Sequence, residues 1–123
     1  MHKKLKVLIF GALLFSFNGA LAAEEVNLYS YRQPFLINQF LNQFTKQTGI
    51  KVNIVYAKKG MLERIKAEGR NTPADAVLTV DISRLSALAD ANLLQPISSP
   101  ILHKNIPPQF RHPDGLWFGL TLR

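Results

Sequence analysis

The chain has no cysteine among its 123 residues. This absence excludes disulfide bonds, thiol nucleophiles and metal sites built on cysteine ligands. It also argues against a lipid-anchored lipoprotein, because lipid attachment would require a cysteine at the processed N-terminus. If the protein is exported, it must fold without covalent cross-links.

Long hydrophobic runs are missing as well. The longest apolar stretch, residues 7–17, spans 11 residues, whereas a membrane-spanning helix needs about 20. Three lysines precede it within residues 1–6, and Ala-Leu-Ala follows at 20–22. This layout predicts a cleavable secretory signal peptide over residues 1–22, with a retained N-terminal anchor as the alternative. The mature chain, residues 23–123, is then expected not to insert into a membrane.

No run of five like charges occurs, although the formal net charge is +7. Three of the lysines belong to the predicted signal peptide, so the mature chain carries only +4. A mild, scattered positive charge is typical of a solvated surface, and it favours small anions only weakly. We therefore expect no nucleic-acid partner.

The residue sets that mark catalysis are also absent. The sequence contains no Ser-His-Asp set, Walker loop or GxGxxG motif. Asp75, Asp81 and Asp114 do not show a spacing that suits paired acid–base work. His103 and His112 have no partner at metal-binding spacing. We predict that the protein is not an enzyme, with a secreted α/β enzyme domain kept as an alternative.

What the sequence does contain is an alternation of strand-like and helix-like segments. Hydrophobic periodicity and the positions of glycine and proline set their limits. The expected strands are residues 26–31, 51–57, 74–80 and 117–122, and the expected helices are residues 34–48, 61–68 and 82–91. Residues 95–115 carry five prolines and are expected to be irregular. This order predicts an α/β fold with parallel strands and right-handed crossovers. The nearly apolar segment 74–80 predicts a strand buried on both faces.

Three connections are expected to meet at the carboxyl edge of this sheet, where ligands of open parallel sheets bind. They are residues 30–33, 57–60 and 79–83. The last expected strand would bring Arg123 to the same edge.

The first of these connections carries the residues best suited to an anion. Arg32 offers a planar fork that matches an oxyanion, and Gln33 can donate from its amide. The N-termini of the following helices add unpaired N–H groups and partial positive charge. Each residue also has a simpler interpretation. Arg32 could pair with Glu24 or Glu25, Gln33 could cap a helix, and Asp81 could be the N-cap of the third helix.

Several stretches, in this order, resemble the N-terminal part of periplasmic ferric-iron-binding proteins of bacterial ABC transporters. They are VNLYSYRQPFLI, TGIKVNIVYAKKGMLERIKAEG, TPADAVLTVDISRL, LLQPI, NIPPQFR and WFGLTLR. The resemblance covers the chain from about residue 25 to its end. It implies a periplasmic-binding-protein type II fold, in which two α/β lobes close on Fe(III). Residues 23–123 would form the first lobe, apparently truncated, around a parallel βαβαβα core.

The resemblance also implies a set of site residues. Tyrosinate oxygens would hold most of the iron, and the main tyrosine ligands are expected beyond residue 123. A synergistic anion, carbonate or similar, would complete the iron shell. In the subgroup with a YSYRQ corner, the first lobe holds this anion, which places Arg32, Gln33 and Arg123 on it. Tyr31 and Asp81 would lie near the site, and Tyr31 is the one candidate for a metal ligand here.

This chain departs from other branches of the family at three positions. Those branches have histidine near Gln33 and glutamate near Val80 as iron ligands, and this chain has neither. Leu122 stands where a second threonine is expected.

The resemblance therefore implies the solute-binding component of an ABC importer. This component would be a periplasmic monomer that delivers ferric iron to a permease. A binding protein for another small anion or a polyamine is the alternative, and so is a non-functional fragment.

Overall fold

The computed structural model describes residues 24–121, so the predicted signal peptide and Arg123 lie outside the described residues. The strands are β1 (Glu25–Ser30), β2 (Lys51–Tyr56) and β3 (Ala76–Leu78). The α-helices are α1 (Pro34–Thr48), α2 (Met61–Glu68), α3 (Ile82–Asp90) and α4 (Pro100–Asn105). Two 3-10 helices, η1 (Gly69–Asn71) and η2 (Pro108–Phe110), complete the described part.

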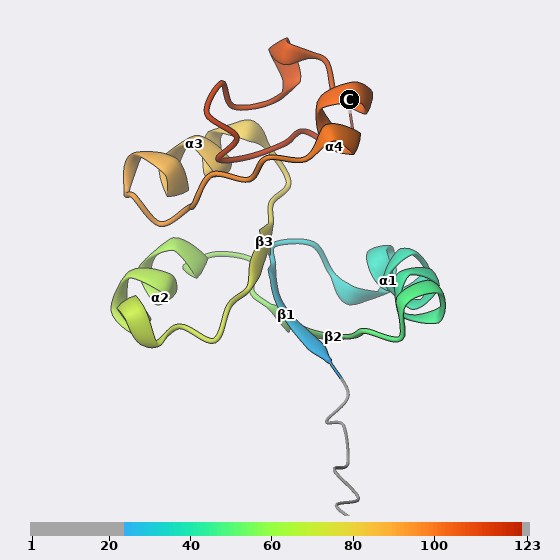
Figure 1. Cartoon of the computed structure of the whole chain (residues 1–123). Coiled ribbons are helices and arrows are strands. Elements are labelled where there is room, and N and C mark those ends of the chain that lie inside the picture. Colours follow the sequence, from blue (N-terminus) through green and yellow to red (C-terminus); the bar gives the residue numbers. More distant parts are fainter. Residues whose placement is uncertain (1–23, 122–123) are drawn as a thin grey trace, which may run out of the picture.

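The three strands form one parallel sheet in the order β2-β1-β3. Leu28 of the central strand lies opposite Ile54 on one side and Ala76 on the other. Figure 1 shows α1 and α2 on either side of the strands, with α3 and α4 beyond the carboxyl ends. The predicted α/β class and parallel βαβαβα order are confirmed.

Proline and glycine set the limits of the first two helices. Pro34 occupies the first turn of α1, where its missing N–H costs no hydrogen bond. Gly49 ends α1 in the left-handed conformation, with φ 75°, and its N–H donates to the Thr45 carbonyl at 2.8 Å. Gly60 and Gly69 bracket α2, whose observed bounds match the predicted 61–68.

The main hydrophobic core lies between the sheet and the helices α2 and α3. Tyr29 of β1, Met61 and Ile65 of α2, and Leu88 of α3 form one buried cluster. Tyr29 and Met61 are fully buried. This cluster fixes the two helices whose N-termini face the carboxyl edge of the sheet.

The opposite side of the sheet, under α1, is only thinly covered within the described residues. Ile37 is the only buried residue of α1. Phe35 and Phe40 are 72% and 69% exposed, and Leu36 and Phe44 are also exposed. The apolar residues of α1 therefore form an uncovered strip in this chain.

The prediction for residues 74–80 was wrong in two respects. β3 comprises only Ala76–Leu78, and these residues are exposed or half-buried. The reason is its place at the edge of the sheet, where it pairs with β1 alone. Pro73, which lacks an N–H, precedes it, and the chain turns into α3 after Val80.

The predictions for the C-terminal part were also wrong. Within the expected irregular stretch 95–115, the chain forms α4 and η2. The expected strand 117–122 is absent up to residue 121, where the described part ends. A single antiparallel bridge, Arg111 to Phe118, is found instead. The apolar segment folds back locally on residues 110–112, through hydrogen bonds from His112 N–H to Trp117 O and from Gly119 N–H to Phe110 O.

Candidate anion-binding site

A buried serine shapes the corner between β1 and α1. Ser30 has no exposed surface. Its hydroxyl accepts from the Arg32 N–H at 2.9 Å and donates to the Arg32 carbonyl at 2.8 Å. These two bonds fold the backbone around the serine, at the corner that carries Tyr31, Arg32 and Gln33.

A pocket of about 350 Å³ opens beside this corner. Its lining residues come from all three predicted connections and their neighbours. They are Tyr31, Arg32, Gln33, Leu36, Tyr56, Lys58, Val80 and Arg84. Three of these side chains are cationic, and none is a carboxylate. The pocket therefore gathers cationic side chains at the location at which parallel sheets bind ligands.

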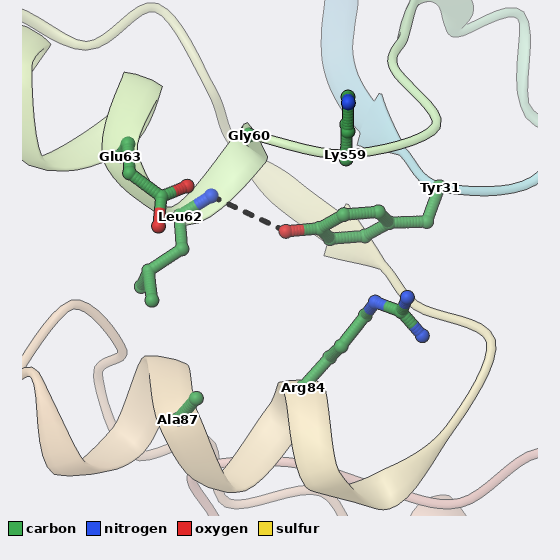
Figure 2. Close-up of a pocket in the computed structure, with 7 residues that line it drawn as sticks. All are labelled: Tyr31, Lys59, Gly60, Leu62, Glu63, Arg84 and Ala87. Carbon is green, nitrogen blue, oxygen red and sulfur yellow. Dashed lines mark hydrogen bonds between the residues drawn. The ribbon is translucent and has the colours of Figure 1, made fainter.

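A smaller pocket of about 200 Å³ shares Tyr31 and Arg84 with the larger one. Figure 2 shows the Tyr31 ring between Lys59 and Arg84, with its hydroxyl pointing at the start of α2. The hydroxyl oxygen accepts from the Leu62 N–H at 3.2 Å. The Arg84 guanidinium carbon lies 5.1 Å from the centre of the ring, within the range of a cation–π contact. Tyr31 thus lines both pockets.

The structure brings two of the three predicted anion residues together. Arg32 and Gln33 line the same pocket, and Arg123 lies outside the described residues. The alternative pairing of Arg32 with Glu24 or Glu25 is not found within residues 24–121. The Glu25 carboxylate binds Lys51 and Asn53 instead. Gln33 occupies the N-cap position of α1, but its side chain makes no capping hydrogen bond.

Asp81 is the N-cap of α3. It does not line the larger pocket itself, but it contacts Arg84, which does. Its carboxylate accepts from the Ser83 hydroxyl at 2.7 Å and from the Arg84 N–H at 2.9 Å. These hydrogen bonds, the one from Ser83 first, hold the pKa of Asp81 below its ordinary value. The carboxylate also forms an ion pair with the Arg84 guanidinium. Asp81 therefore positions Arg84 at the pocket wall.

Tyr29 belongs to a different environment, although it is only two residues from Tyr31. Its hydroxyl donates to the Glu68 carboxylate at 2.9 Å. Arg64 and Thr72 donate to the same carboxylate, at 2.8 and 2.7 Å. Burial, with the Glu68 hydrogen bond second, raises the pKa of Tyr29. A phenol that keeps its proton in this way is not suited to bind a metal, and it acts as part of the core.

No group of three potential histidine or carboxylate metal ligands occurs within residues 24–121. His103 packs against Phe118, with ring centres 6.3 Å apart. His112 meets Trp117 edge-on at 5.9 Å, and its Nδ1 accepts from the Asp114 N–H. Both histidines thus support the local fold of the C-terminal part.

Sequence reasoning missed Lys58, Tyr56 and Arg84 as lining residues. Lys58 lies in the predicted connection 57–60, but no role at the site was predicted for it. Arg84 lies one residue beyond the connection 79–83, in the first turn of α3. Extending each connection by one helical turn, in which side chains still face the sheet edge, would have found it.

A parallel α/β fold with a pocket at the carboxyl edge of its sheet is the arrangement of a ligand-binding protein. Residues 22–121 match the family model for bacterial extracellular solute-binding proteins. The chain belongs to this family.

The relatives that it matches are named for iron. The chain is 48% identical over 101 residues to iron uptake protein A1 of Synechocystis, covering 81% of this chain and 28% of the relative. Among solved structures, it is similar to ferric iron-binding protein A of Mannheimia haemolytica in an open conformation. That match has 57% identity and a TM-score of 0.77, over 80% of this chain and 31% of the other.

A third match is the Trichodesmium protein IdiA (FutA) in complex with iron and citrate ligands. It has 47% identity and a TM-score of 0.73, over 77% of this chain and 30% of the other. The chain therefore spans about a third of the length of the relatives it matches. No helix in residues 24–121 is both long and apolar enough to cross a membrane.

Proposed function

We propose that this chain is the anion-holding first lobe of a ferric-iron-binding protein that serves an ABC importer. Export through a cleavable signal peptide, residues 1–22, would bring it to the periplasm, and a permease would take the iron from the whole protein. The family match and the iron-related names of the relatives support this proposal. No catalytic activity is part of it, since the relatives named above are binding and uptake proteins.

One observation carries the assignment of the anion: the larger pocket presents Arg32, Gln33 and further cations without a lining carboxylate. Bidentate hydrogen bonds from a guanidinium match a carbonate-like oxyanion. Arg123, which lies outside the described residues, would add a third arginine to Arg32 and Arg84. The same absence of carboxylates disfavours a polyamine, because a polyamine requires negative partners.

The iron itself would be held mainly from outside this chain. Ferric iron is a hard cation that prefers charged oxygen ligands. Tyr31 is the first-lobe candidate, but its oxygen already accepts a backbone hydrogen bond from α2. Three tyrosinates, which are expected beyond residue 123, would balance the charge of Fe(III). The anion beside them would then need the cationic side chains of the pocket as partners. Low pH would release the iron, because metal ligands must be deprotonated to bind.

Anion binding by the purified chain tests this proposal. Bicarbonate is titrated at low ionic strength into the wild type and into Arg32→Gln, and the shifts of backbone amide resonances are followed. We expect a dissociation constant raised about tenfold in Arg32→Gln, as for loss of one charge-assisted hydrogen bond. Arg70→Gln is the control, because Arg70 is exposed in η1 and lines neither pocket. Equal binding by all three proteins would refute the role of Arg32.

A second titration examines the iron. We expect no tight, coloured Fe(III) complex from this chain alone, with or without bicarbonate. Visible absorbance on addition of ferric nitrilotriacetate measures this. A stoichiometric complex would show that the described lobe carries its own strong ligands, and the division of roles between the lobes would then be wrong.

A further inference from the structure

The parallel sheet has two edges, and only one of them is protected against further pairing. β3 forms one edge, but it has only three residues and closely follows Pro73. Short strands and proline are common means by which proteins prevent a sheet from extending. β2 forms the other edge. It has six residues, KVNIVY, which pair with β1 in continuous register and include no proline. The edge at β2 therefore has the length and composition of a strand-pairing surface.

The backbone of β2 leaves three residues with hydrogen-bonding groups that face outward. Alternate residues of a strand bond to the same neighbour, and the Ala57 N–H continues this ladder by donating to the Ser30 carbonyl at 3.1 Å. The odd-numbered residues of β2 are thus turned toward β1. The N–H and C=O groups of Val52, Ile54 and Tyr56 point away from it, and no strand within residues 24–121 lies beyond them. Each of these residues offers one donor and one acceptor to an added strand.

The side chains of the same three residues lie on the face of the sheet that α1 covers. α1 packs on β2, and Figure 1 shows it on the β2 side of the sheet. The odd-numbered Val55, by contrast, packs against the buried cluster formed with α2 and α3. The uncovered strip of α1 continues to the end of β2, because Leu36 and Tyr56 line the same pocket. A strand added to β2 would therefore place alternate side chains beside this strip.

Charge distinguishes one end of this edge from the other. Lys51, at the start of β2, forms an ion pair with Glu25 at 3.5 Å. Lys58 and Lys59, which follow the other end, are exposed and form no ion pair within residues 24–121. Acidic residues in an added strand would be attracted to these two lysines. A second copy of this chain is a poorer occupant, because its β2 carries no carboxylate to place beside them.

We propose that β2 is a docking edge for a partner protein, which adds an extended segment to the sheet as a fourth strand beside β2. The segment has apolar residues at alternate positions, facing the strip on α1, and acidic residues at the end beside Lys58 and Lys59. Backbone hydrogen bonds supply the affinity, and the alternate side chains supply the selectivity. This inference goes beyond the proposed function and does not depend on it, since it requires neither iron nor an anion.

A designed peptide serves as the probe. It alternates valine and threonine over the length of β2 and ends in a pair of aspartates. A second version begins with the aspartates, so that parallel and antiparallel addition are both sampled. Each peptide is titrated at pH 7 into the purified chain, kept dilute enough to be monomeric by analytical ultracentrifugation. We expect amide hydrogen exchange at Val52, Ile54 and Tyr56 to slow about tenfold at peptide saturation, with no change at residues 76–78 on the opposite edge.

Matched changes in the peptide test the two kinds of contact without altering the protein. Alternate backbone nitrogens of the peptide are methylated in each of the two registers. The register that removes the donors to β2 should weaken binding about tenfold, and the other register should not. Lysines in place of the aspartates should also weaken binding, by a factor that added salt diminishes.

A proline tests the same edge from the protein side. Val52→Pro removes one outward N–H and leaves the ladder with β1 in place, so it should weaken peptide binding about tenfold. Arg70→Gln is the control, because Arg70 lies in η1, away from β2 in sequence and in the sheet. Circular dichroism checks that both variants fold.

The outcomes separate this inference from its alternatives. Unchanged exchange of the β2 amides at peptide saturation overturns it, as does protection confined to residues 76–78 or equal binding by the two methylated registers. Protection that appears on concentrating the chain alone, and that the peptide does not displace, assigns the edge to a second copy and overturns it as well. Bicarbonate binding is measured on the same samples, and its presence or absence decides the proposed function independently of this inference.

Discussion

At the scale of single residues, two tyrosines near the end of β1 lie in different environments. Tyr29 is fully buried and donates its hydroxyl to Glu68, whereas Tyr31 stands at the wall of both pockets. The difference arises because Tyr29 lies within β1, under α2, and Tyr31 lies one residue beyond the strand. The position relative to the strand end thus decides whether each phenol lies in the core or lines a pocket.

Glu68 gives a prediction about pH. The hydrogen bond from Arg64, then that from Thr72, holds the pKa of Glu68 below its ordinary value of 4.5. A carboxyl whose pKa is lower in the folded state stabilises the fold at pH above its unfolded value, and this contribution is lost as the pH falls through the lowered pKa. We therefore expect the free energy of unfolding, from urea titrations, to decrease below about pH 4.5 partly through this group.

The variant Glu68→Gln should show a shallower acid dependence than the wild type and a lower stability at pH 7. Glu63→Gln is the matched control, because Glu63 lies on the same helix and is exposed. If the acid slopes of the wild type and Glu68→Gln coincide, the Glu68 network is not a source of the pH dependence.

At the scale of elements, the N-cap of α3 gives a second prediction. Asp81 accepts the Arg84 N–H at 2.9 Å, so Asp81→Ala leaves that donor without its partner. The expected loss is about 1 kcal/mol in the free energy of unfolding, the usual cost of removing such a cap. Asp81→Asn keeps a capping oxygen and should lose much less. Urea denaturation at pH 7 measures both, and equal stabilities of the two variants would contradict the capping role.

Two glycines allow a comparison of backbone strain with steric overlap. Gly49 and Gly115 both have positive φ, 75° and 72°. A Cβ at Gly49 would meet nothing within 4 Å, whereas one at Gly115 would lie 2.5 Å from the Ile97 carbonyl oxygen. Gly49→Ala should cost about 1–2 kcal/mol, the penalty of the left-handed conformation for alanine. Gly115→Ala should cost more, because the backbone at Ile97 must also move.

Urea or thermal denaturation of the two alanine variants measures the loss in the free energy of unfolding that each substitution causes. If Gly115→Ala is no less stable than Gly49→Ala, the close approach of residues 97 and 115 does not hold this part of the chain.

Elements with local signals were predictable from the sequence, and elements that depend on tertiary neighbours were not. α2 matches its predicted bounds because glycines stand on both sides of it. The length and burial of β3 depend on which strands lie beside it, and no local pattern reports that. α4 had a local signal, Ser99 followed by Pro100, with the Ser99 hydroxyl accepting from the Leu102 N–H. This signal was missed because the five prolines of residues 95–115 led us to expect an irregular segment.

The candidate site was predictable in its location but not in all its members. The rule that ligands bind at the carboxyl ends of parallel strands located the corner with Arg32 and Gln33. Arg84 depends on how α3 is oriented against Tyr31, which is a property of the packed core. The expected strand 117–122 was wrong because its apolar residues pair with the segment just before them rather than with the sheet.

At the scale of the whole molecule, the uncovered strip on α1 gives a prediction about association. Phe35, Leu36 and Phe40 are all more than half exposed, and Lys46 is the one charged residue of the helix. Contiguous exposed apolar surface promotes association. We expect this chain on its own to self-associate as its concentration rises, which analytical ultracentrifugation measures.

Phe40→Gln should weaken this association about tenfold, as expected when one large buried apolar side chain is lost from a contact. Asn38→Gln, a polar exchange on the same helix, should leave it unchanged. A chain that stays monomeric at all concentrations, or a Phe40 variant that associates as strongly as the wild type, would show that the strip does not drive contacts. The prediction concerns this chain alone, which spans about a third of its relatives.

The double hydrogen bond of Ser30 has a consequence for substitutions at this corner. The buried hydroxyl of Ser30 hydrogen-bonds to both the N–H and the carbonyl of residue 32. The backbone path at this corner therefore does not depend on the side chains at positions 32 and 33. Substitutions of the side chains at positions 32 and 33 are therefore expected to leave the backbone path of the lobe unchanged.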